Sequence, residues 1–425
     1  MGWVTAVFLL LLVIGLPVAF TIGLAGFLFF LMSDFLPTSI GVQQIASVSQ
    51  SFPLLAVPFF VLAGHLMNES GITSRLFDFA RVTVGWMAGG LAQVSVVLST
   101  LMGGVSGSAV ADAAMEARVL GPTMIAEGYS RGYTGAVIAI SSLITATIPP
   151  SLGLILYGFV GNVSIGRLFL AGIVPGLLMM AFLMVTAWLI ARRRGYRTRG
   201  ATLPKAGEVM RALWAARFAL AFPVLLVITI RGGLFTPSEV GAGAVLYAIL
   251  IGVAVHRDLD MAGIFRAFEH AITDIGMIML IILMSGMLGY AIIFEQLPQD
   301  IAAVLVGVSS NPTAIFAIIL AALFVAGLFI ESTVLVLLLT PIFVPVITQI
   351  GVDPVHFGVL MMTIVTLGSM TPPVGVAMYT VCSLIDCDVG EYVRESLPFL
   401  AAILVLVALL VLLPDVVLFV PRAFF

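Results

Sequence analysis

Charged residues are scarce in this chain. Its 18 Lys and Arg and 21 Asp and Glu make up 9% of 425 residues, whereas soluble domains average about 25%. So few charges cannot cover the surface of a water-soluble particle, which excludes a soluble enzyme and a disordered protein. The single lysine, Lys205, and a net charge of −3 leave no basic face for nucleic acid.

Cysteine and histidine are also scarce. Cys382 and Cys387 have a spacing that suits neither a zinc ribbon nor a thioredoxin-like site, so we interpret them as small apolar side chains. The four histidines show no metal-ligand spacing, and no phosphate-binding loop or hydrolase signature occurs. We therefore expect no enzyme activity and no cofactor.

Apolar residues dominate instead, at 61% of the chain. Runs such as residues 8–14 and 335–339 do not alternate with polar residues, which argues against a membrane β-barrel. Since a membrane-spanning helix needs about 20 apolar residues, we predict an all-α polytopic membrane protein with about 11 transmembrane helices. The expected spans are Val4–Met32, Leu54–Met67, Val82–Leu101, Tyr133–Phe159, Leu168–Ala191, Phe218–Ile230, Val240–Val255, Ala271–Phe294, Ala314–Ile330, Phe357–Val381 and Phe399–Phe419.

The N-terminal segment, Met1–Leu31, has no basic region and no small-residue cleavage site. It is therefore expected to be a retained transmembrane helix rather than a signal peptide.

A basic segment divides the chain. Five arginines lie between residues 192 and 199, and arginine next to a helix end marks the cytoplasmic side. We predict that residues 192–217 (Arg192 to Arg217) form a basic cytoplasmic loop or arm. It separates a first repeat, residues 1–191, from a second, residues 218–425.

The two halves repeat at an offset of 223 residues. This offset pairs Pro122 with Pro345, and Pro175 with Pro398. Further pairs at the same or nearly the same offset are Gly128 with Gly351, Gly135 with Gly358, Pro149-Pro150 with Pro372-Pro373, Gly153 with Gly375, and Tyr157 with Tyr379. Repeats that carry interrupted helices at corresponding positions are typical of secondary transporters.

An inverted repeat needs an odd number of crossings between corresponding segments, and our spans give six. Either residues 211–230 lie along the membrane, or a crossing near residues 301–308 is missing from the prediction.

Two apolar segments are interrupted by Gly, Ser or Pro, and we predict them to be re-entrant hairpins over residues 102–125 and 331–350. In the first, Gly103 to Ser108 would form the turn, although small residues also serve simple helix packing. The second carries Glu331, a candidate buried acid; the alternative is a residue in water at the mouth of the hairpin.

Each predicted hairpin is followed by a broken helix, over residues 133–159 and 357–381. Pro149, Pro150, Pro372 and Pro373 remove amide donors there, leaving carbonyls near Thr145–Ile148 and Gly368–Thr371 unpaired. Carbonyls at the end of a half-helix can coordinate a cation, and the N-terminus of the next half-helix suits an anionic substrate group.

Asp112 and Glu116 lie one helical turn apart on the returning arm of the first predicted hairpin. Like charges at this spacing repel unless they are solvated or bridged. We expect them to face a cytoplasmic cavity and to pair with Arg118 or Arg131, rather than to bind a coupling ion.

Five motifs resemble the large (DctM-like) membrane subunit of TRAP (tripartite ATP-independent periplasmic) transporters over essentially the whole chain. These motifs are Gly103-Gly104-Val105-Ser106-Gly107-Ser108, Ile148-Pro149-Pro150-Ser151, Phe235-Thr236-Pro237-Ser238-Glu239, Leu339-Thr340-Pro341-Ile342-Phe343-Val344-Pro345, and Met370-Thr371-Pro372-Pro373-Val374-Gly375. The resemblance implies an elevator-type, sodium-driven importer of an organic acid such as a C4-dicarboxylate, a sialic acid or another sugar acid, in the bacterial inner membrane. It also implies two partners: a small four-helix membrane subunit on a separate polypeptide and a periplasmic binding protein.

The resemblance also implies the ligands. A first sodium site would use Ser106, Gly107, Ser108, Thr145 and Ile148, and a second would use Gly327, Ser332, Gly368 and Thr371. Substrate would lie between the hairpin tips, near Ser108, Thr147, Ser369 and Thr371. The alternatives are a sodium symporter for divalent anions that needs no binding protein, and, less favoured, a channel or a purely structural membrane protein.

Overall fold

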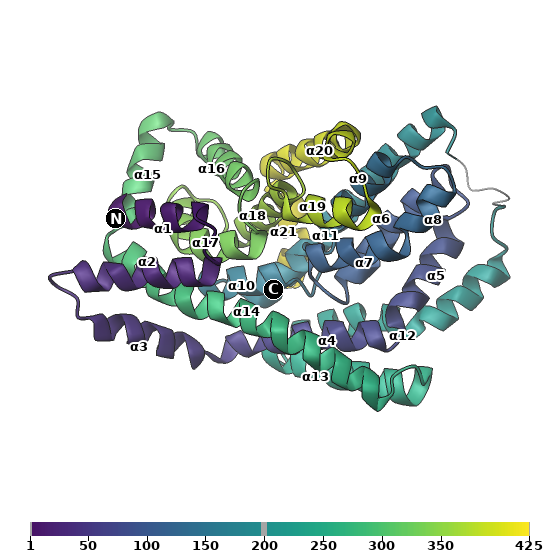
Figure 1. The fold of residues 1–425 in the computed structure, drawn as a ribbon, viewed down its shortest axis with the longest axis horizontal. Coiled ribbons are helices and arrows are strands. Elements are labelled where there is room, and N and C mark those ends of the chain that lie inside the picture. Colours follow the sequence, from purple (N-terminus) through teal and green to yellow (C-terminus); the bar gives the residue numbers. More distant parts are fainter. Residues whose placement is uncertain (1, 197–201, 425) are drawn as a thin grey trace.

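The computed structural model describes residues 2–196 and 202–424, and every regular element among them is a helix (Figure 1). This confirms the predicted all-α class. The helices are α1 (Gly2–Val13), α2 (Val18–Met32), α3 (Thr38–Ser49), η1 (Phe52–Leu55), α4 (Ala56–Glu69), α5 (Ile72–Val84), α6 (Gly90–Gly103), α7 (Ala109–Val119), α8 (Gly121–Ala126), α9 (Arg131–Ser141), α10 (Leu152–Val160), α11 (Ile165–Arg194), α12 (Ala206–Arg231), α13 (Pro237–Leu250), η2 (Ile251–His256), α14 (Met261–Phe294), α15 (Leu297–Val308), α16 (Pro312–Gly327), α17 (Ser332–Gln349), α18 (Pro354–Ser369), α19 (Val376–Ile385), α20 (Val389–Leu412) and α21 (Pro414–Phe424).

Seven helical segments among the described residues are long and apolar enough to cross a membrane. They comprise η1 with α4, α11, α12, α13 with η2, α14, α17 and α20, and seven further apolar helices of 10–17 residues accompany them. Helix length therefore supports a polytopic membrane protein but does not confirm the predicted number of eleven crossings.

Besides the two predicted broken helices, three predicted spans are each divided between two helices. One of them is Phe399–Phe419, in which α20 ends at Leu412 and α21 begins at Pro414. Val4–Met32 is interrupted between α1 and α2, where Gly15 has a positive φ of 87° and Pro17 precedes α2. Val82–Leu101 is interrupted between α5 and α6, where Gly89 has a φ of 73°. Glycine at positive φ ends a helix without steric cost, and a proline has no amide proton to continue one.

The structure also changes the boundaries of the two hairpins. Hairpin 1 consists of α6, a turn at residues 104–108 and α7, and hairpin 2 consists of α16, a turn at residues 328–331 and α17. Residues 102–125 and 331–350 thus hold only a turn and a returning arm. The descending arms lie in the predicted spans Val82–Leu101 and Ala314–Ile330.

This correction bears on the parity of the crossings. With Ala314–Ile330 reassigned to hairpin 2, five predicted spans remain between the hairpins, the odd number that an inverted repeat requires. The 12 residues of α15 are too few to cross a bilayer, which takes about 20.

The basic segment is shorter than predicted. Arg192, Arg193 and Arg194 complete the last turn of α11, and α12 already begins at Ala206. Arg197 and Arg199 lie outside the described residues. Basic side chains in the last turn of a helix interact favourably with its dipole, which favours the extension of α11.

The repeat is visible in the elements. Helices α6, α7, α9, α10 and α11 begin 222 to 224 residues before α16, α17, α18, α19 and α20. Their packing is reciprocal, since α7 packs against α19 while α17 packs against α10. Each hairpin therefore lies against the broken helix of the other half.

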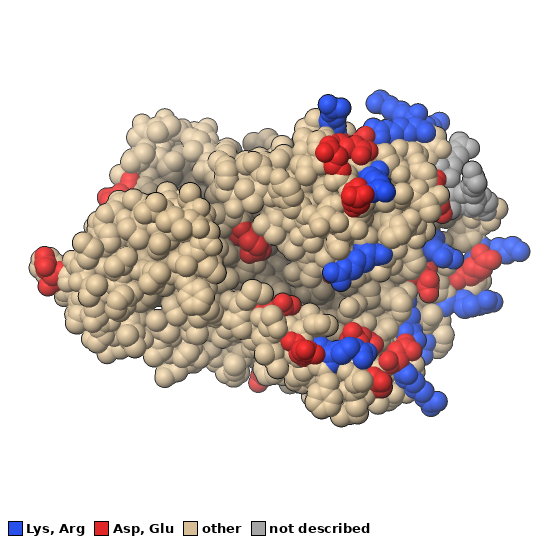
Figure 2. Space-filling view, in the orientation of Figure 1, with Lys and Arg blue, Asp and Glu red and all other residues tan. Residues whose placement is uncertain are grey.

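The long helix α14 runs along one edge of the molecule, together with α2, α3 and α4, and the hairpins and broken helices lie beside it (Figure 1). Lys and Arg gather at one end of the face in Figure 2, over α5, α12 and the neighbouring helix ends, and this face shows none at the opposite end. On this face the basic side chains are thus strongly polarised.

Candidate functional site

The tip of hairpin 1 touches the proline break of the first half, which we call break 1 (residues 142–151). The Leu152 amide donates a hydrogen bond to the Gly107 carbonyl, with an N–O distance of 3.4 Å. Gly107 has a φ of 66°, and a Cβ atom there would lie 2.1 Å from the Pro150 carbonyl oxygen. Only glycine permits this contact between two backbones.

The end of α6 packs on the same break. A Cβ atom on Gly103 would lie 2.8 Å from Cβ of Ile148, and the Thr145 hydroxyl donates to the Ser99 carbonyl at 2.9 Å. The structure therefore brings the predicted residues Ser106, Gly107, Thr145 and Ile148 together around one hairpin tip. Ser108 caps α7 by accepting a hydrogen bond from the Ala111 amide.

Asp112 adds a carboxylate to this cluster. The Ser106 hydroxyl donates to its Oδ1 at 2.6 Å, Asp112 is 2% exposed, and its Oδ2 has no hydrogen-bond partner among the described residues. The expectation that Asp112 faces a cytoplasmic cavity and pairs with an arginine is wrong. An uncompensated buried carboxylate is costly, and a bound cation would offset that cost.

Glu116, one turn further along α7, is completely buried. Its two oxygens accept hydrogen bonds from the hydroxyls of Ser95 at 2.5 Å and Ser99 at 2.7 Å, and Ser141 of α9 contacts both serines. The expected pairing with Arg131 is also wrong, because that arginine pairs with Asp386. The matching spacing of Ser95/Ser99 and Asp112/Glu116, each one turn apart, was a sequence signal for this contact between α6 and α7.

Break 1 supplies free carbonyls. Within the described chain the carbonyl oxygens of Thr145, Thr147 and Ile148 accept no hydrogen bond, whereas that of Ala146 accepts one from the Ser151 hydroxyl at 2.5 Å. Thr147 is fully buried and its hydroxyl donates to the Leu143 carbonyl, with Met179 of α11 beside it. No hydrogen bond joins Thr147 to Ser108 among the described residues.

Hairpin 2 meets its own break, break 2 (residues 370–375), in a similar way. The amides of Val374 and Gly375 donate to the Leu328 carbonyl at 3.2 and 3.3 Å. A Cβ atom on Gly368 would lie 2.6 Å from the Gly327 carbonyl carbon, so α16 and α18 cross in backbone contact. The Pro149-Pro150 and Pro372-Pro373 bonds, at corresponding positions, are both cis.

Glu331 lies at the tip of hairpin 2 and is half-buried. It caps α17 by accepting hydrogen bonds from the Thr333 and Val334 amides, and the hydroxyls of Ser332 and Thr333 donate to its Oε1 at 3.0 and 2.9 Å. Glu331, the candidate buried acid, thus lies half-buried at a helix N-terminus, where its negative charge is favoured.

The other predicted residues of the second half make local hydrogen bonds. The hydroxyls of Ser369 and Thr371 donate to the carbonyls of Thr366 and Leu367, each at 2.8 Å. The carbonyl of Gly368 is paired with the Thr371 amide, contrary to expectation, and that of Met370 accepts from the Tyr392 hydroxyl. Within the described chain the carbonyls of Ser369 and Thr371 accept no hydrogen bond.

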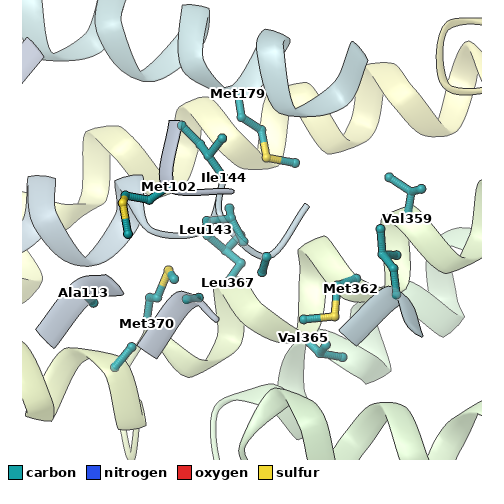
Figure 3. Close-up of a cluster of buried hydrophobic side chains, with 14 of the residues drawn as sticks. Met102, Ala113, Leu143, Ile144, Met179, Val359, Met362, Val365, Leu367 and Met370 are labelled. Atoms are coloured by element: carbon teal, nitrogen blue, oxygen red, sulfur yellow. The ribbon is translucent and has the colours of Figure 1, made fainter. Parts of the chain in front are cut away.

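The two breaks lie close together in the core. Figure 3 shows Leu143 from break 1 near Leu367, which precedes break 2, and Met370, the first residue of break 2. The face in Figure 2 is hollowed near its centre, where α10 and the turn before α7 lie in Figure 1, and acidic side chains border the hollow. The two acids are confined to the first half, since leucines at 335 and 339 occupy the positions that correspond to Asp112 and Glu116.

Comparison with known proteins places this geometry in a family. Residues 5–416 match the family of the DctM component of the tripartite ATP-independent periplasmic transporter. The chain is 38% identical to the sialic acid TRAP transporter large permease protein SiaM of Vibrio cholerae, over 100% of this chain and 97% of that protein. It is 33% identical to the 2,3-diketo-L-gulonate TRAP transporter large permease protein YiaN of Escherichia coli, over 95% of each.

A solved structure agrees at the level of the fold. The YdaH transporter of Alcanivorax borkumensis superposes with a TM-score of 0.68, covering 91% of this chain and 90% of that one, at 13% identity. The relatives of this chain are named as transporter permeases, so the expectation that it is not an enzyme is confirmed. The chain belongs to the DctM family, the large membrane component of the tripartite ATP-independent periplasmic transporters.

Proposed function

We propose that the chain couples the movement of sodium to the import of an organic acid across the bacterial inner membrane. The observation that carries this proposal is the oxygen-lined tip of hairpin 1. Ser106, Asp112 with its unpartnered Oδ2, and the free carbonyls of Thr145 and Ile148 lie around one turn. Carboxylate, hydroxyl and carbonyl oxygens at a broken helix are the ligands that transporters of this kind offer to sodium.

The second sodium site would lie at hairpin 2, around Gly327, Ser332 and the free carbonyls of Ser369 and Thr371. Both sites then rest on the same construction, a hairpin tip against a proline break. Substrate would bind between the two tips near Ser108, Ser369 and Thr371, where the N-termini of α10 and α19 favour a carboxylate.

The substrate class follows from the relatives, whose names refer to sialic acid and 2,3-diketo-L-gulonate. We propose a sugar acid or a related carboxylate. The partners would be the small membrane subunit and a periplasmic binding protein, as the tripartite family name indicates. The arginine-rich end would face the cytoplasm, in keeping with the positive-inside rule.

The motion would be of the elevator type, in which both hairpins and both broken helices travel together past the edge that contains α14. The reciprocal packing of α7 with α19 and α17 with α10 supports this proposal, since it joins these elements into one body.

Uptake into proteoliposomes tests the proposal. The chain is reconstituted with its small subunit, and uptake of labelled sialic acid, diketogulonate and C4-dicarboxylates is measured with and without the binding protein and an inward sodium gradient. Uptake that needs both supports the proposal. Uptake without binding protein would favour the self-sufficient anion symporter, and sodium-independent, non-saturating flux would favour a channel.

A further inference from the structure

A row of three side chains at the start of α12 has no part in the transport mechanism proposed above. Arg211, Trp214 and Arg217 follow one another at a spacing of three residues, which makes them neighbours on one side of the helix. The guanidinium carbon of Arg217 lies 4.4 Å from the centre of the Trp214 ring. Met210 and Leu213 lie beside this row and are exposed, so the outer face of α12 is both basic and apolar.

The rest of the described chain does not cover this outer face. Trp214 is 67% exposed, whereas Ala216 and Ala219, on the other side of α12, are buried. Helix α12 packs along α5. A large aromatic side chain left exposed beside other apolar side chains marks a surface that meets a lipid or a partner.

The two arginines of the row lack acidic partners. Neither Arg211 nor Arg217 forms an ion pair with an acidic side chain of the described chain. One amino group of Arg217, Nη1, donates to the Trp214 carbonyl at 2.5 Å. The remaining donors of both guanidinium groups are therefore available to an outside acceptor.

The acids on the neighbouring elements do not change this balance. Glu208 accepts a hydrogen bond from the amide of Lys205 at the start of α12, and these two residues have opposite charges. On α5, Asp78 and Arg81 are both exposed and balance in number, while Arg75 pairs with Asp258. The arginines of the row are thus the excess charge on this side of the molecule.

The row lies where an apolar helix emerges from the membrane. Residues 218–230, which continue α12, contain no charged residue, and α12 is one of the helices long and apolar enough to span a bilayer. Near the end of α11, Arg192 lies over the Trp188 ring in the same manner, at 5.2 Å. Tryptophan and arginine at the end of a span are typical of the depth of the lipid headgroups.

We infer that the outer face of α12 binds an anionic phospholipid of the leaflet at the arginine-rich end. Its phosphate accepts hydrogen bonds from Arg211 and Arg217, because the guanidinium fork matches two phosphate oxygens. The glycerol and upper acyl chains lie against Trp214 and Leu213. A zwitterionic lipid brings an ammonium group that both arginines repel, so the face selects lipids with net negative charge.

The bound lipid would hold a helix that supports hairpin 1. A Cβ atom on Gly104, in the turn of hairpin 1, would lie 2.2 Å from Cγ of Pro223 of α12, so the turn rests directly on this helix. An effect of the lipid on transport therefore rests on the proposed function, whereas the binding of the lipid does not.

Quenching of Trp214 fluorescence tests the binding. The full chain, with Trp3, Trp86 and Trp188 replaced by Phe, is reconstituted with its small subunit in phosphatidylcholine vesicles. Brominated phosphatidylglycerol or brominated phosphatidylcholine then replaces part of the lipid. We expect the anionic lipid to quench Trp214 at a several-fold lower mole fraction, and equal quenching by both lipids overturns the proposal.

A chain that retains only Trp3 is the matched control. Trp3 is exposed and lies in α1, which contains no charged residue. We expect it to be quenched equally by the two brominated lipids. A preference for the anionic lipid as large as that of Trp214 would show a general enrichment around the protein and would overturn the site.

Arginine variants in the chain that retains only Trp214 test the ligands. Arg211→Gln and Arg217→Gln should each reduce the preference for phosphatidylglycerol about fivefold, the contribution of one basic residue near an anionic surface. Arg118→Gln, at an exposed arginine of α7 outside the row, should retain it. An equal loss in all three variants, or none in either variant of the row, overturns the assignment.

Two comparisons complete the test. The quenching is repeated without the small subunit, and a preference for the anionic lipid that appears only then assigns the face to the protein partner and overturns the lipid site. Uptake is also compared in vesicles with and without phosphatidylglycerol. We expect faster uptake with it, and less of this gain in Arg217→Gln. Binding with unchanged uptake keeps the site and overturns only its effect on transport.

Discussion

At the scale of single residues, the chemistry concentrates on two buried acids of α7, Asp112 and Glu116. They differ in their surroundings, because Glu116 is fully bonded to serines while one oxygen of Asp112 is left free. We therefore propose that Asp112 binds the coupling ion, whereas the hydrogen bonds of Glu116 join the two arms of hairpin 1.

Asp112→Asn should therefore weaken sodium binding. It removes the negative charge while keeping the size of the side chain, so we expect the sodium concentration for half-maximal uptake to rise about tenfold or more, since charged ligands contribute more than neutral ones. Uptake is measured against sodium concentration at matched protein amounts. Asp78→Asn, on the exposed face of α5, is the control, and an unchanged sodium curve for Asp112→Asn would contradict the assignment.

Ser106→Ala and Thr371→Ala test the two proposed sodium sites in the same uptake assay. We expect each to reduce the apparent affinity for sodium more than it reduces protein abundance. If neither variant changes the dependence of uptake on sodium concentration, the assignment of these two residues to sodium binding is wrong.

Glu116→Ala should chiefly affect stability. The hydroxyls of Ser95 and Ser99 would lose their acceptors within a buried cluster, at a cost of roughly 1–3 kcal/mol for each orphaned group. The measurement is the melting temperature of the purified protein, with Arg118→Ala, an exposed neighbour on α7, as control. Equal melting temperatures for both variants would show that the cluster does not hold hairpin 1.

At the scale of elements, glycine pairs determine how closely the hairpins approach the broken helices. Gly368→Ala would place a Cβ atom 2.6 Å from the Gly327 carbonyl carbon, forcing α16 away from α18. We expect overpacking to cost about 1–3 kcal/mol and uptake to fall with it. Gly276→Ala on α14, with nothing within 4 Å of the added atom, should retain both uptake and melting temperature.

The elements also show what sequence reasoning can reach. The turn of hairpin 1 and both proline breaks were predictable, because Gly, Ser and Pro constrain the backbone locally. The turn of hairpin 2 was not, because residues 328–331 contain none of these three residue types. The hairpin boundaries were not, since an arm such as α16 has the same apolar composition as a true span. The burial of Asp112 and Glu116 was also missed. The serine partners of Glu116 come from α6, and the matching one-turn spacing of serines and acids indicates this contact only when the two helices are compared with each other.

At the scale of the whole molecule, the position of the arginines gives a testable orientation. In a chain whose two native cysteines are replaced, a cysteine at Arg193 would lie at the arginine-rich end, and one at exposed Ser310 lies in the connection between α15 and α16, away from that end (Figure 1). We expect a membrane-impermeant maleimide added to whole cells to label Ser310→Cys and not Arg193→Cys. The reverse pattern would invert the proposed topology.

The exchange of partners between the two halves has a consequence for how the chain is made. Helix α7 carries both acids of hairpin 1, yet it packs against α19, which ends at Ile385. During synthesis hairpin 1 can pack on α9 of its own half, but the side of α7 that contacts α19 must stay uncovered in the membrane until most of the second half has been translated. Such separation in sequence slows folding, so this wait is when the nascent chain is most exposed to quality-control proteases.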